Sequence, residues 1–343
     1  MTPLVTALVD TFNHERFLEQ ALVSVLDQGL SPSELEIVVV DDGSTDQTPS
    51  VVQKFLPRVK YLRKKNGGQA SAFNAAFPEI NGQIVSLLDG DDWWAKGKLS
   101  TVIDALEQNR EISAVGHGFY DVDEATNNIQ VCVPQETKDL NLETPQAAGE
   151  ALLRWHFLRT STITVRRKAF EQVIPIPEQF VFSADSPIAM VSMARGVRIL
   201  AMPLCYYRRH SGNLYAVDAK NMAGLRRKCD MDELMFEMLG PLLIRLGVST
   251  ECVSALLDPP WVTASRLSLS TFGGSRLKTF RTEMRSFHSE YKNPSMGYIL
   301  FKRLIMGATI FLLPPRRFYS VRDWYAQHNL GRLRNLVFRP RSR

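Results

Sequence analysis

The chain has 343 residues, of which 45% are hydrophobic, so it can bury a sizeable core and disorder is not expected. Its four cysteines stand far apart and show no paired metal-ligand spacing. This spacing argues against a zinc site or a disulfide framework and favours reduced thiols in a cytoplasmic protein. The N-terminus lacks the basic region and uninterrupted apolar run of a secretory signal, because Asp10 interrupts its apolar stretch.

The net charge of +5 is distributed unevenly along the chain. Ten Lys or Arg residues and a single acid, Asp323, lie from Phe301 onward, a balance of +9. The first 300 residues therefore carry a charge of about −4. A surface that attracts polyanions is expected only in the C-terminal tail, and nucleic acid is not expected as a partner.

The first hundred residues alternate between apolar runs and segments with helical spacing. This alternation is typical of a largely parallel sheet with helices between its strands. Asn13 can cap the first helix, which is predicted to end near Gly29. Strands are predicted at 4–9, 35–40, 60–62 and 83–88, and further helices at 48–56 and 69–77.

The pattern continues to about residue 220 and then changes. We expect a helix to about 108, a strand at 112–120, a long polar loop at 121–150, strand and helix signals at 161–173, a helix after Asp185 and a strand at 197–207. Beyond these, amphipathic helices predominate. They are punctuated by Gly240-Pro241, Pro259-Pro260, Gly273-Gly274 and Pro314-Pro315. We predict two domains, an α/β domain at 1–220 and a mainly helical extension with a basic tail at 221–343.

Two of the predicted buried strands end in acidic residues. The strand at 35–40 runs into DDGSTD, and the strand at 83–88 runs into DGDD. In open α/β sheets, ligands bind at the carboxyl ends of the strands. Three carboxylates within four positions repel one another unless a cation joins them, and hard oxygen ligands suit magnesium or manganese. An isolated DGDD is equally compatible with a solvated acidic turn, but the second acidic strand end favours a ligand site.

Several ordered sequence blocks make a resemblance specific. They are TFN (11–13), VVVDDGSTD (38–46), NGGQASAFNAA (66–76), LLDGDDWW (87–94), ADSPIAM (184–190) and YRRHSGN (207–213). In this order they resemble family 2 glycosyltransferases of the GT-A fold over roughly residues 4–213. The resemblance implies a Rossmann-like mixed sheet flanked by helices. It also implies transfer of a sugar from a nucleoside diphosphate donor, usually with inversion.

The resemblance implies a donor-binding set at several strand ends. The set consists of Thr11, Asn13, Asp41, Asp42, Asn66, Gly67, Gly68, Asp89, Arg209 and His210. Carboxylates accept hydrogen bonds from a base N–H and from ribose hydroxyls, which suits Asp41 and Asp42, although one of the two is expected only to cap its turn. The glycines let the backbone approach the donor, and a plain turn would suit them equally well. His210 can serve equally as a phosphate or metal contact or as a structural residue.

The resemblance also implies a divalent cation, Mn²⁺ or Mg²⁺. Asp91 is expected to bind the metal directly, while Asp89 is directed to the metal or to the donor's ribose or sugar. Asp92 is expected to cap the helix after Trp93. Trp94 matches a position on the acceptor side, where an aromatic face suits a sugar ring, although core packing is an alternative.

Asp185 stands where the family has its catalytic base. An acceptor hydroxyl must lose its proton as it attacks the anomeric carbon, and a positioned carboxylate can accept that proton. The family's acidic doublet is reduced here, because Ala184 replaces the first acid. An alternative role for Asp185 is to cap the following helix. Arg208, Arg209 and His210 can neutralise the leaving diphosphate.

Other classes fit less well. Neither G-x-x-x-x-G-K-[ST] nor G-x-G-x-x-G follows a strand, which argues against a phosphate-loop NTPase and a dinucleotide dehydrogenase. The Q-x-x-R-W pattern of processive synthases is absent after Asp185, so a single-addition enzyme is preferred. The alternative from another class is a non-catalytic sugar-nucleotide or carbohydrate-binding protein. The uridine diphosphate donor is a family expectation, and the acceptor is a glycan, polysaccharide or lipid-linked hydroxyl.

The apolar run at 304–313 is too short to span a bilayer. Arg316, Arg317 and Arg322 follow it, together with the aromatic residues Phe318, Tyr319 and Trp324. We predict an interfacial helix that is attracted to anionic lipid, which would place a cytoplasmic enzyme at the inner face of the cell membrane. Packing of this helix on the catalytic domain and oligomerisation through it are alternatives.

Overall fold

The computed structural model describes residues 2–213, 222–290 and 296–327. The chain divides into two compact units. The first comprises Met1–Val217 with Glu237–Leu256, and the second comprises Asp218–Phe236 with Leu257–Arg343. The predicted domain boundary near residue 220 stays a prediction.

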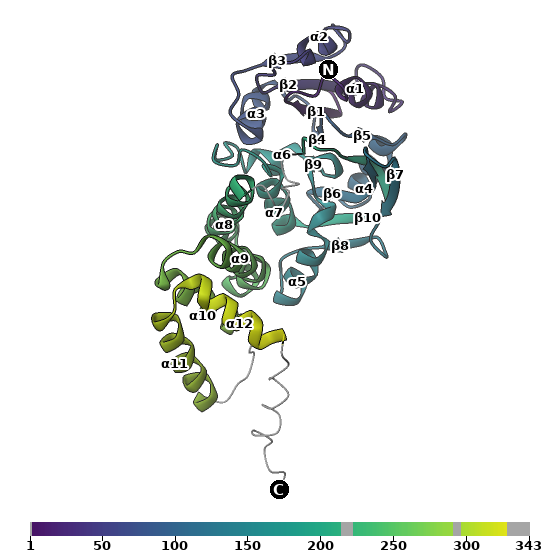
Figure 1. The fold of residues 1–343 in the computed structure, drawn as a ribbon. Coiled ribbons are helices and arrows are strands. Elements are labelled where there is room, and N and C mark those ends of the chain that lie inside the picture. The colour runs from purple at the N-terminus through teal and green to yellow at the C-terminus, as the bar shows by residue number, and fades with distance from the viewer. Residues whose placement is uncertain (1, 214–221, 291–295, 328–343) are drawn as a thin grey trace. The chain divides into compact units, whose positions relative to one another are not determined.

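The first unit contains one mixed sheet, so the predicted α/β class is confirmed. Among the described residues the strand order is β3-β2-β1-β4-β9-β6-β10-β5, with β7 beside β6 and β8 beside β10. Figure 1 shows β2, β1 and β4 next to one another. The strands are β1 (Val5–Thr11), β2 (Leu35–Asp41), β3 (Lys60–Arg63), β4 (Ile84–Asp89), β5 (Trp93–Trp94), β6 (Ala114–Asp123), β7 (Asn128–Cys132), β8 (Lys138–Leu140), β9 (Thr164–Arg166) and β10 (Val197–Arg209).

Helices connect and cover these strands. The helix α3 packs against β1 and β2, and α4 packs against β6 and β10. Their apolar residues recur at helical spacing, so one face of each helix is buried against the sheet. The helices are α1 (Leu18–Leu26), α2 (Thr48–Gln53), α3 (Gln69–Ala76), α4 (Lys98–Gln108), α5 (Pro145–Arg154), α6 (Arg167–Glu171) and α7 (Asp185–Arg195), with short 3₁₀ turns η1 (Phe77–Glu79), η2 (Trp155–Phe157) and η3 (Thr160–Thr162).

The register of the parallel strands brings their acidic ends together. The strand β1 pairs with β2 on one side and with β4 on the other. Thr11 is level with Asp41, and Asp10 is level with Asp89. Residues 5–9 of β1 are buried between these neighbours, which explains why all but Thr6 are apolar. The carboxyl ends of three strands therefore present their polar side chains at one edge.

The expected loop at 121–150 is wrong in part. It contains β7, β8 and α5, and β7 pairs antiparallel with the end of β6. The strand β7 has few buried positions, with Ile129 and Val131 more than half exposed, so its hydrophobic pattern is weak. The helix α5 does carry a start signal, because Thr144 accepts a hydrogen bond from the Ala147 N–H ahead of Pro145.

The later helices are α8 (Met222–Arg245), α9 (Thr250–Phe272), α10 (Arg276–Glu290), α11 (Met296–Leu312) and α12 (Pro315–Gln327). Gly273-Gly274 and Pro314-Pro315 lie between helices, as their pattern indicates. Pro241, Pro259 and Pro260 lie inside α8 and α9 instead of interrupting them. Burial of apolar neighbours such as Leu243 and Trp261 offsets the hydrogen bonds that proline removes. None of the described helices is long and apolar enough to cross a bilayer.

Candidate functional site

Three carboxylates meet in the turn after β4. Oxygens of Asp89, Asp91 and Asp92 all lie within 4.8 Å of one another. Gly90 makes the turn possible, because an added Cβ would come within 2.9 Å of atoms of Thr11 and His14. Burial, reinforced by the neighbouring acids, raises the pKa of both Asp89 and Asp92 well above the ordinary value. A cation at this turn would relieve both effects.

Asp91 differs from its neighbours because two imidazole rings face it. His210 Nε2 lies 3.0 Å from Asp91 Oδ2, and His14 Nε2 lies 3.8 Å from the same oxygen. The Gly212 N–H donates to His210 Nδ1, so the opposite nitrogen of that ring is left to donate to Asp91. Burial opposes ionisation of Asp91, yet the His210 hydrogen bond and the nearby rings lower its pKa. Asp91 is therefore the most readily ionised of the three acids.

Asp92 is not a helix cap, so that expectation is wrong. The next helix, α4, begins only at Lys98, after Gly97. Asp92 is buried and accepts hydrogen bonds from Ser161 Oγ at 2.6 Å and from the Arg208 N–H at 2.7 Å. Its carboxylate therefore joins the turn after β4 to η3 and to the end of β10.

Asp10 is a fourth acid at this edge, and the sequence interpretation missed it. The register places it beside Asp89, and one of its oxygens is buried without a hydrogen-bond partner in the described part of the chain. Burial, together with the charge of Asp91, raises the pKa of Asp10 to about 8. The available signal was an acid directly after a buried apolar strand, the same signal that identified Asp41 and Asp89.

Asp185 occupies the first turn of α7. One carboxylate oxygen accepts hydrogen bonds from the Thr160 N–H at 2.8 Å and from Thr160 Oγ1 at 3.1 Å. Ala184 occupies the N-cap position, so the alternative of Asp185 as a helix cap is wrong. Burial raises the pKa of Asp185, while the bonds from Thr160 oppose that rise. The other oxygen has one long contact among the described residues, 3.5 Å from Ser186 Oγ.

Gln69, at the start of α3, connects these groups. Its Nε2 lies 3.1 Å from Asp89 Oδ1, 3.1 Å from Thr160 Oγ1 and 3.4 Å from Asp10 Oδ2. Its Oε1 accepts a hydrogen bond from the Ala184 N–H at 2.9 Å. One amide thus touches the acidic turn, the neighbouring strand end and the start of α7. Gln69 lies within the NGGQ block, but sequence reasoning assigned it no role.

We expect Gln69→Leu to slow the predicted sugar transfer roughly 10- to 100-fold, because hydrogen bonds to charged groups contribute roughly 1.5–3 kcal/mol. Leucine keeps the volume of glutamine and removes its hydrogen bonds. Turnover at saturating donor, together with the melting temperature, measures the effect. Gln53→Leu, at an exposed position of α2, is the matched control. Unchanged turnover in a folded Gln69→Leu protein would contradict this role.

Asp41, the last residue of β2, and Asp42, the next residue, have separate roles. Asp41 is fully buried and accepts hydrogen bonds from the Ser44 N–H and from the Tyr61 hydroxyl, both at 2.7 Å, so it is the acid that caps the turn. Asp42 accepts hydrogen bonds from the backbone N–H groups of Gly67 and Gly68. It therefore joins its strand end to the loop before α3.

Contacts between neighbouring segments hold the loops that are predicted to bind the donor. Asn13 has φ of +57° and accepts a hydrogen bond from the Thr45 N–H at 2.8 Å, so it holds the loop after β2 and does not cap α1. Thr11 is buried beside His14. Gly68 has φ of +85°, and a Cβ there would come within 2.5 Å of the Val181 backbone. Asn66 is exposed.

The two arginines at the end of β10 point in different directions. Arg209 is exposed and pairs with Asp121 at 2.5 Å and with Asp123 at 3.5 Å. Arg208 lies closer to the acidic turn, because its Nε donates to the Asp91 carbonyl at 2.8 Å. The predicted donor role of Arg209 stays a prediction.

The two tryptophans of β5, Trp93 and Trp94, lie in different environments. Trp94 is 3% exposed, and its ring lies under the Lys98 ammonium, as expected for core packing. Trp93 is partly exposed and stacks on Tyr206, with the ring centroids 4.8 Å apart. The acceptor-side role of Trp94 stays a prediction, and Trp93 is the ring of this pair nearer to solvent.

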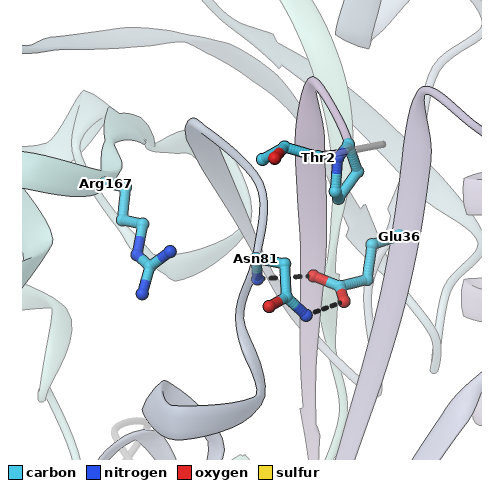
Figure 2. A pocket seen from close by; sticks show the side chains of 5 residues that line it. Thr2, Glu36, Asn81 and Arg167 are labelled. Carbon is cyan, nitrogen blue, oxygen red and sulfur yellow. Dashed lines mark hydrogen bonds between the residues drawn. The ribbon is translucent and has the colours of Figure 1, made fainter.

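A separate pocket lies where β1 and β2 begin, at the opposite ends of these strands from the acidic turn (Figure 2). Its carboxylate, Glu36, accepts hydrogen bonds from Thr6 and from the backbone and side-chain nitrogens of Asn81. These bonds hold the start of the sheet together. The pocket shares no residue with the acidic cluster.

Comparisons with known proteins identify the family of the chain. Residues 6–174 match the model of the Glycosyl transferase family 2. The chain is 30% identical over 257 residues to the uncharacterized glycosyltransferase alr2836 of Nostoc sp., covering 71% of this chain and 76% of that protein. It is 28% identical to the uncharacterized glycosyltransferase EpsJ of Bacillus subtilis, covering 64% of this chain and 65% of that protein. The chain belongs to glycosyltransferase family 2, and it is a glycosyltransferase.

The fold comparison gives the same class. Residues 1–349 of S. aureus TarS superimpose with a TM-score of 0.54 at 18% identity, covering 83% of this chain and 88% of that one. The likeness confirms the GT-A fold of the mixed sheet and its helices.

Proposed function

We propose that the protein transfers a sugar from a nucleoside-diphosphate-sugar to an acceptor hydroxyl, with inversion and one addition per cycle. The observation that carries this proposal is the hydrogen-bond network through Gln69 and Thr160. It links Asp89, in the acidic turn, to Asp185, at the start of α7. A donor held at the first acid and an acceptor activated by the second would therefore meet across this network.

The acidic turn fits a divalent cation. Its three carboxylates offer hard oxygen atoms within 4.8 Å of one another. Among the described residues, no lysine or arginine side chain is bonded to the carboxylate of Asp89 or Asp91 to offset their mutual repulsion. We infer that Asp91 and Asp89 hold Mn²⁺ or Mg²⁺. When bound, the ion would supply positive charge to the leaving diphosphate. Arg208 lies beside the same turn and would add to that charge, while His210 holds the Asp91 carboxylate through a hydrogen bond.

Asp185 is the proposed base. Thr160 holds one carboxylate oxygen, which leaves the second oxygen to accept the proton of the acceptor hydroxyl. The acceptor oxygen then forms its bond to the anomeric carbon while the bond from that carbon to the diphosphate oxygen breaks. Attack from the face opposite the leaving group inverts the anomeric centre. The proton ends on Asp185 and the negative charge on the diphosphate.

We infer a uridine diphosphate donor. The TarS structure with the same fold is in complex with UDP-GlcNAc, which supports uridine without identifying the sugar for this chain. The residues proposed to surround the nucleoside are those of the linked loops: Thr11, Asn13, Asp41, Asp42, Asn66, Gly67 and Gly68. Arg209 and His210 are proposed on the diphosphate side, and Trp94 on the acceptor side.

A thermal-shift screen tests donor binding. We expect a uridine diphosphate with manganese to stabilise the fold by about 2.7 kcal/mol at 100 times its dissociation constant. Other nucleoside diphosphates and samples without metal serve as controls. A second assay, of donor hydrolysis or sugar transfer, distinguishes an enzyme from a protein that only binds the donor. No shift with any nucleoside diphosphate would contradict the donor class.

We also propose that the enzyme acts in the cytoplasm at the inner face of the membrane, on a glycan, polysaccharide or lipid-linked acceptor. The four cysteines are free, which suits a reducing compartment. Nucleic acid is not among the proposed partners. An acceptor attached to lipid would be presented at the membrane surface, where a peripheral enzyme could reach it.

A further inference from the structure

We propose that the outer face of α11 in the second unit lies on an anionic lipid surface. This face consists of Leu304, Ile305, Ala308, Phe311 and Leu312, all of which are exposed. The two leucines are 76% and 77% exposed, and Phe311 is 60% exposed. Positions i, i+1, i+4, i+7 and i+8 lie on one side of a helix, so these residues form a continuous apolar stripe.

The opposite face of α11 is already used for packing. Ile310 is fully buried in a core cluster with Leu269, Phe318 and Tyr319, against which Met306 and Leu313 also pack. The helix is therefore apolar on both sides. Within the described part of the chain the outer side has one ring contact, between Phe311 and Phe280 with centroids 6.4 Å apart, and its leucines stay largely exposed. A helix that is apolar all round requires an apolar environment on its second side as well. Large exposed stripes of this kind mark interaction sites.

The basic residues of α12 indicate what kind of surface covers the apolar stripe of α11. Arg316 and Arg317, at the start of α12, are exposed, and Trp324 on the same helix is 54% exposed. Residues 328–343 lie outside the described structure, and their sequence adds five arginines and no acid. An apolar stripe beside basic residues and an aromatic ring is complementary to an anionic lipid surface. A second copy would bring like charges together, which disfavours self-association through this stripe.

The length of α11 determines how it would lie. Its 17 residues extend about 26 Å, less than the hydrocarbon thickness of roughly 30 Å. The helix would therefore lie along the surface with its stripe at the boundary of the acyl chains. The side chains of 298–303, which belong to the predicted interfacial segment, lie outside the described residues.

The test is vesicle flotation of the full chain. Vesicles of phosphatidylcholine mixed with an equal part of phosphatidylglycerol are compared with pure phosphatidylcholine. We expect binding to the anionic vesicles that weakens with salt and falls at least roughly tenfold in Leu304→Glu/Leu312→Glu. Leu153→Glu is the matched control, because Leu153 is 73% exposed on α5 in the first unit. It should bind like the original protein.

A second measurement reads insertion directly. Brominated phosphatidylglycerol should quench the added fluorescence of Phe311→Trp, and should leave that of Leu153→Trp unchanged. Equal flotation of the double variant and its control would overturn the proposal. So would a stable dimer that dissociates on Leu304→Glu/Leu312→Glu, because a second copy would then cover the stripe. Donor hydrolysis should be the same in all variants, which keeps this test independent of the proposed reaction.

Discussion

Asp185→Asn is expected to lower sugar transfer roughly 10²- to 10⁴-fold while donor affinity stays near normal. The amide keeps an oxygen that can accept the hydrogen bonds from Thr160, so the start of α7 should remain in place. It removes the proton acceptor. Donor affinity by calorimetry and transfer rate on the same sample measure the two effects separately.

The pH dependence of the original enzyme provides an independent readout. Burial raises the pKa of Asp185, and a general base acts only when it is ionised. Transfer should therefore be lost as the pH falls through a pKa above the ordinary aspartate range, and residual activity of Asp185→Asn should lack this dependence. Near-normal turnover in the variant would make Asp185 a structural residue, and lost donor affinity would place it on the donor side.

Asp91→Asn is the second substitution with a large expected effect. We expect it to remove most activity, roughly 10²- to 10³-fold, and most of the dependence on added manganese or magnesium. Asp91 is the acid whose pKa is lowered, so it is the most readily available as a charged ligand. The amide would keep the contact with His210 but lose that charge. Activity measured against metal concentration tests this.

Asp92→Asn, at the next residue of the same turn, is the matched comparison. Its amide oxygen can still accept from the Arg208 N–H, and its NH₂ can donate to Ser161 Oγ. We therefore expect a milder loss and a preserved response to metal. Equal losses at the two positions, or full activity of Asp91→Asn, would sink the assignment of Asp91 as the principal ligand.

The hydrophobic pattern of the sequence predicted a strand or helix correctly where the burial of that one element determines its residues. Residues 37–40 are apolar because both faces of β2 are buried there. Asp41 and Asp42 follow where the turn supplies hydrogen bonds to their buried carboxylates. The same reasoning predicted the end of β4. It failed for β7, which has little burial to impose a pattern, and for Pro259-Pro260, whose helix is stabilised by buried neighbours.

By itself, the sequence determined the class of fold, the edge of the sheet that carries the acids and the ordered blocks of the family. Only the tertiary structure decided which groups touch. His14 and His210 both reach Asp91, although 196 positions separate the two histidines. Gln69 hydrogen-bonds to both Asp89 and Thr160, although Thr160 lies 91 positions after Gln69 in the sequence. Such contacts depend on strand register and helix packing, which bring distant segments together and leave no periodic signal within either segment.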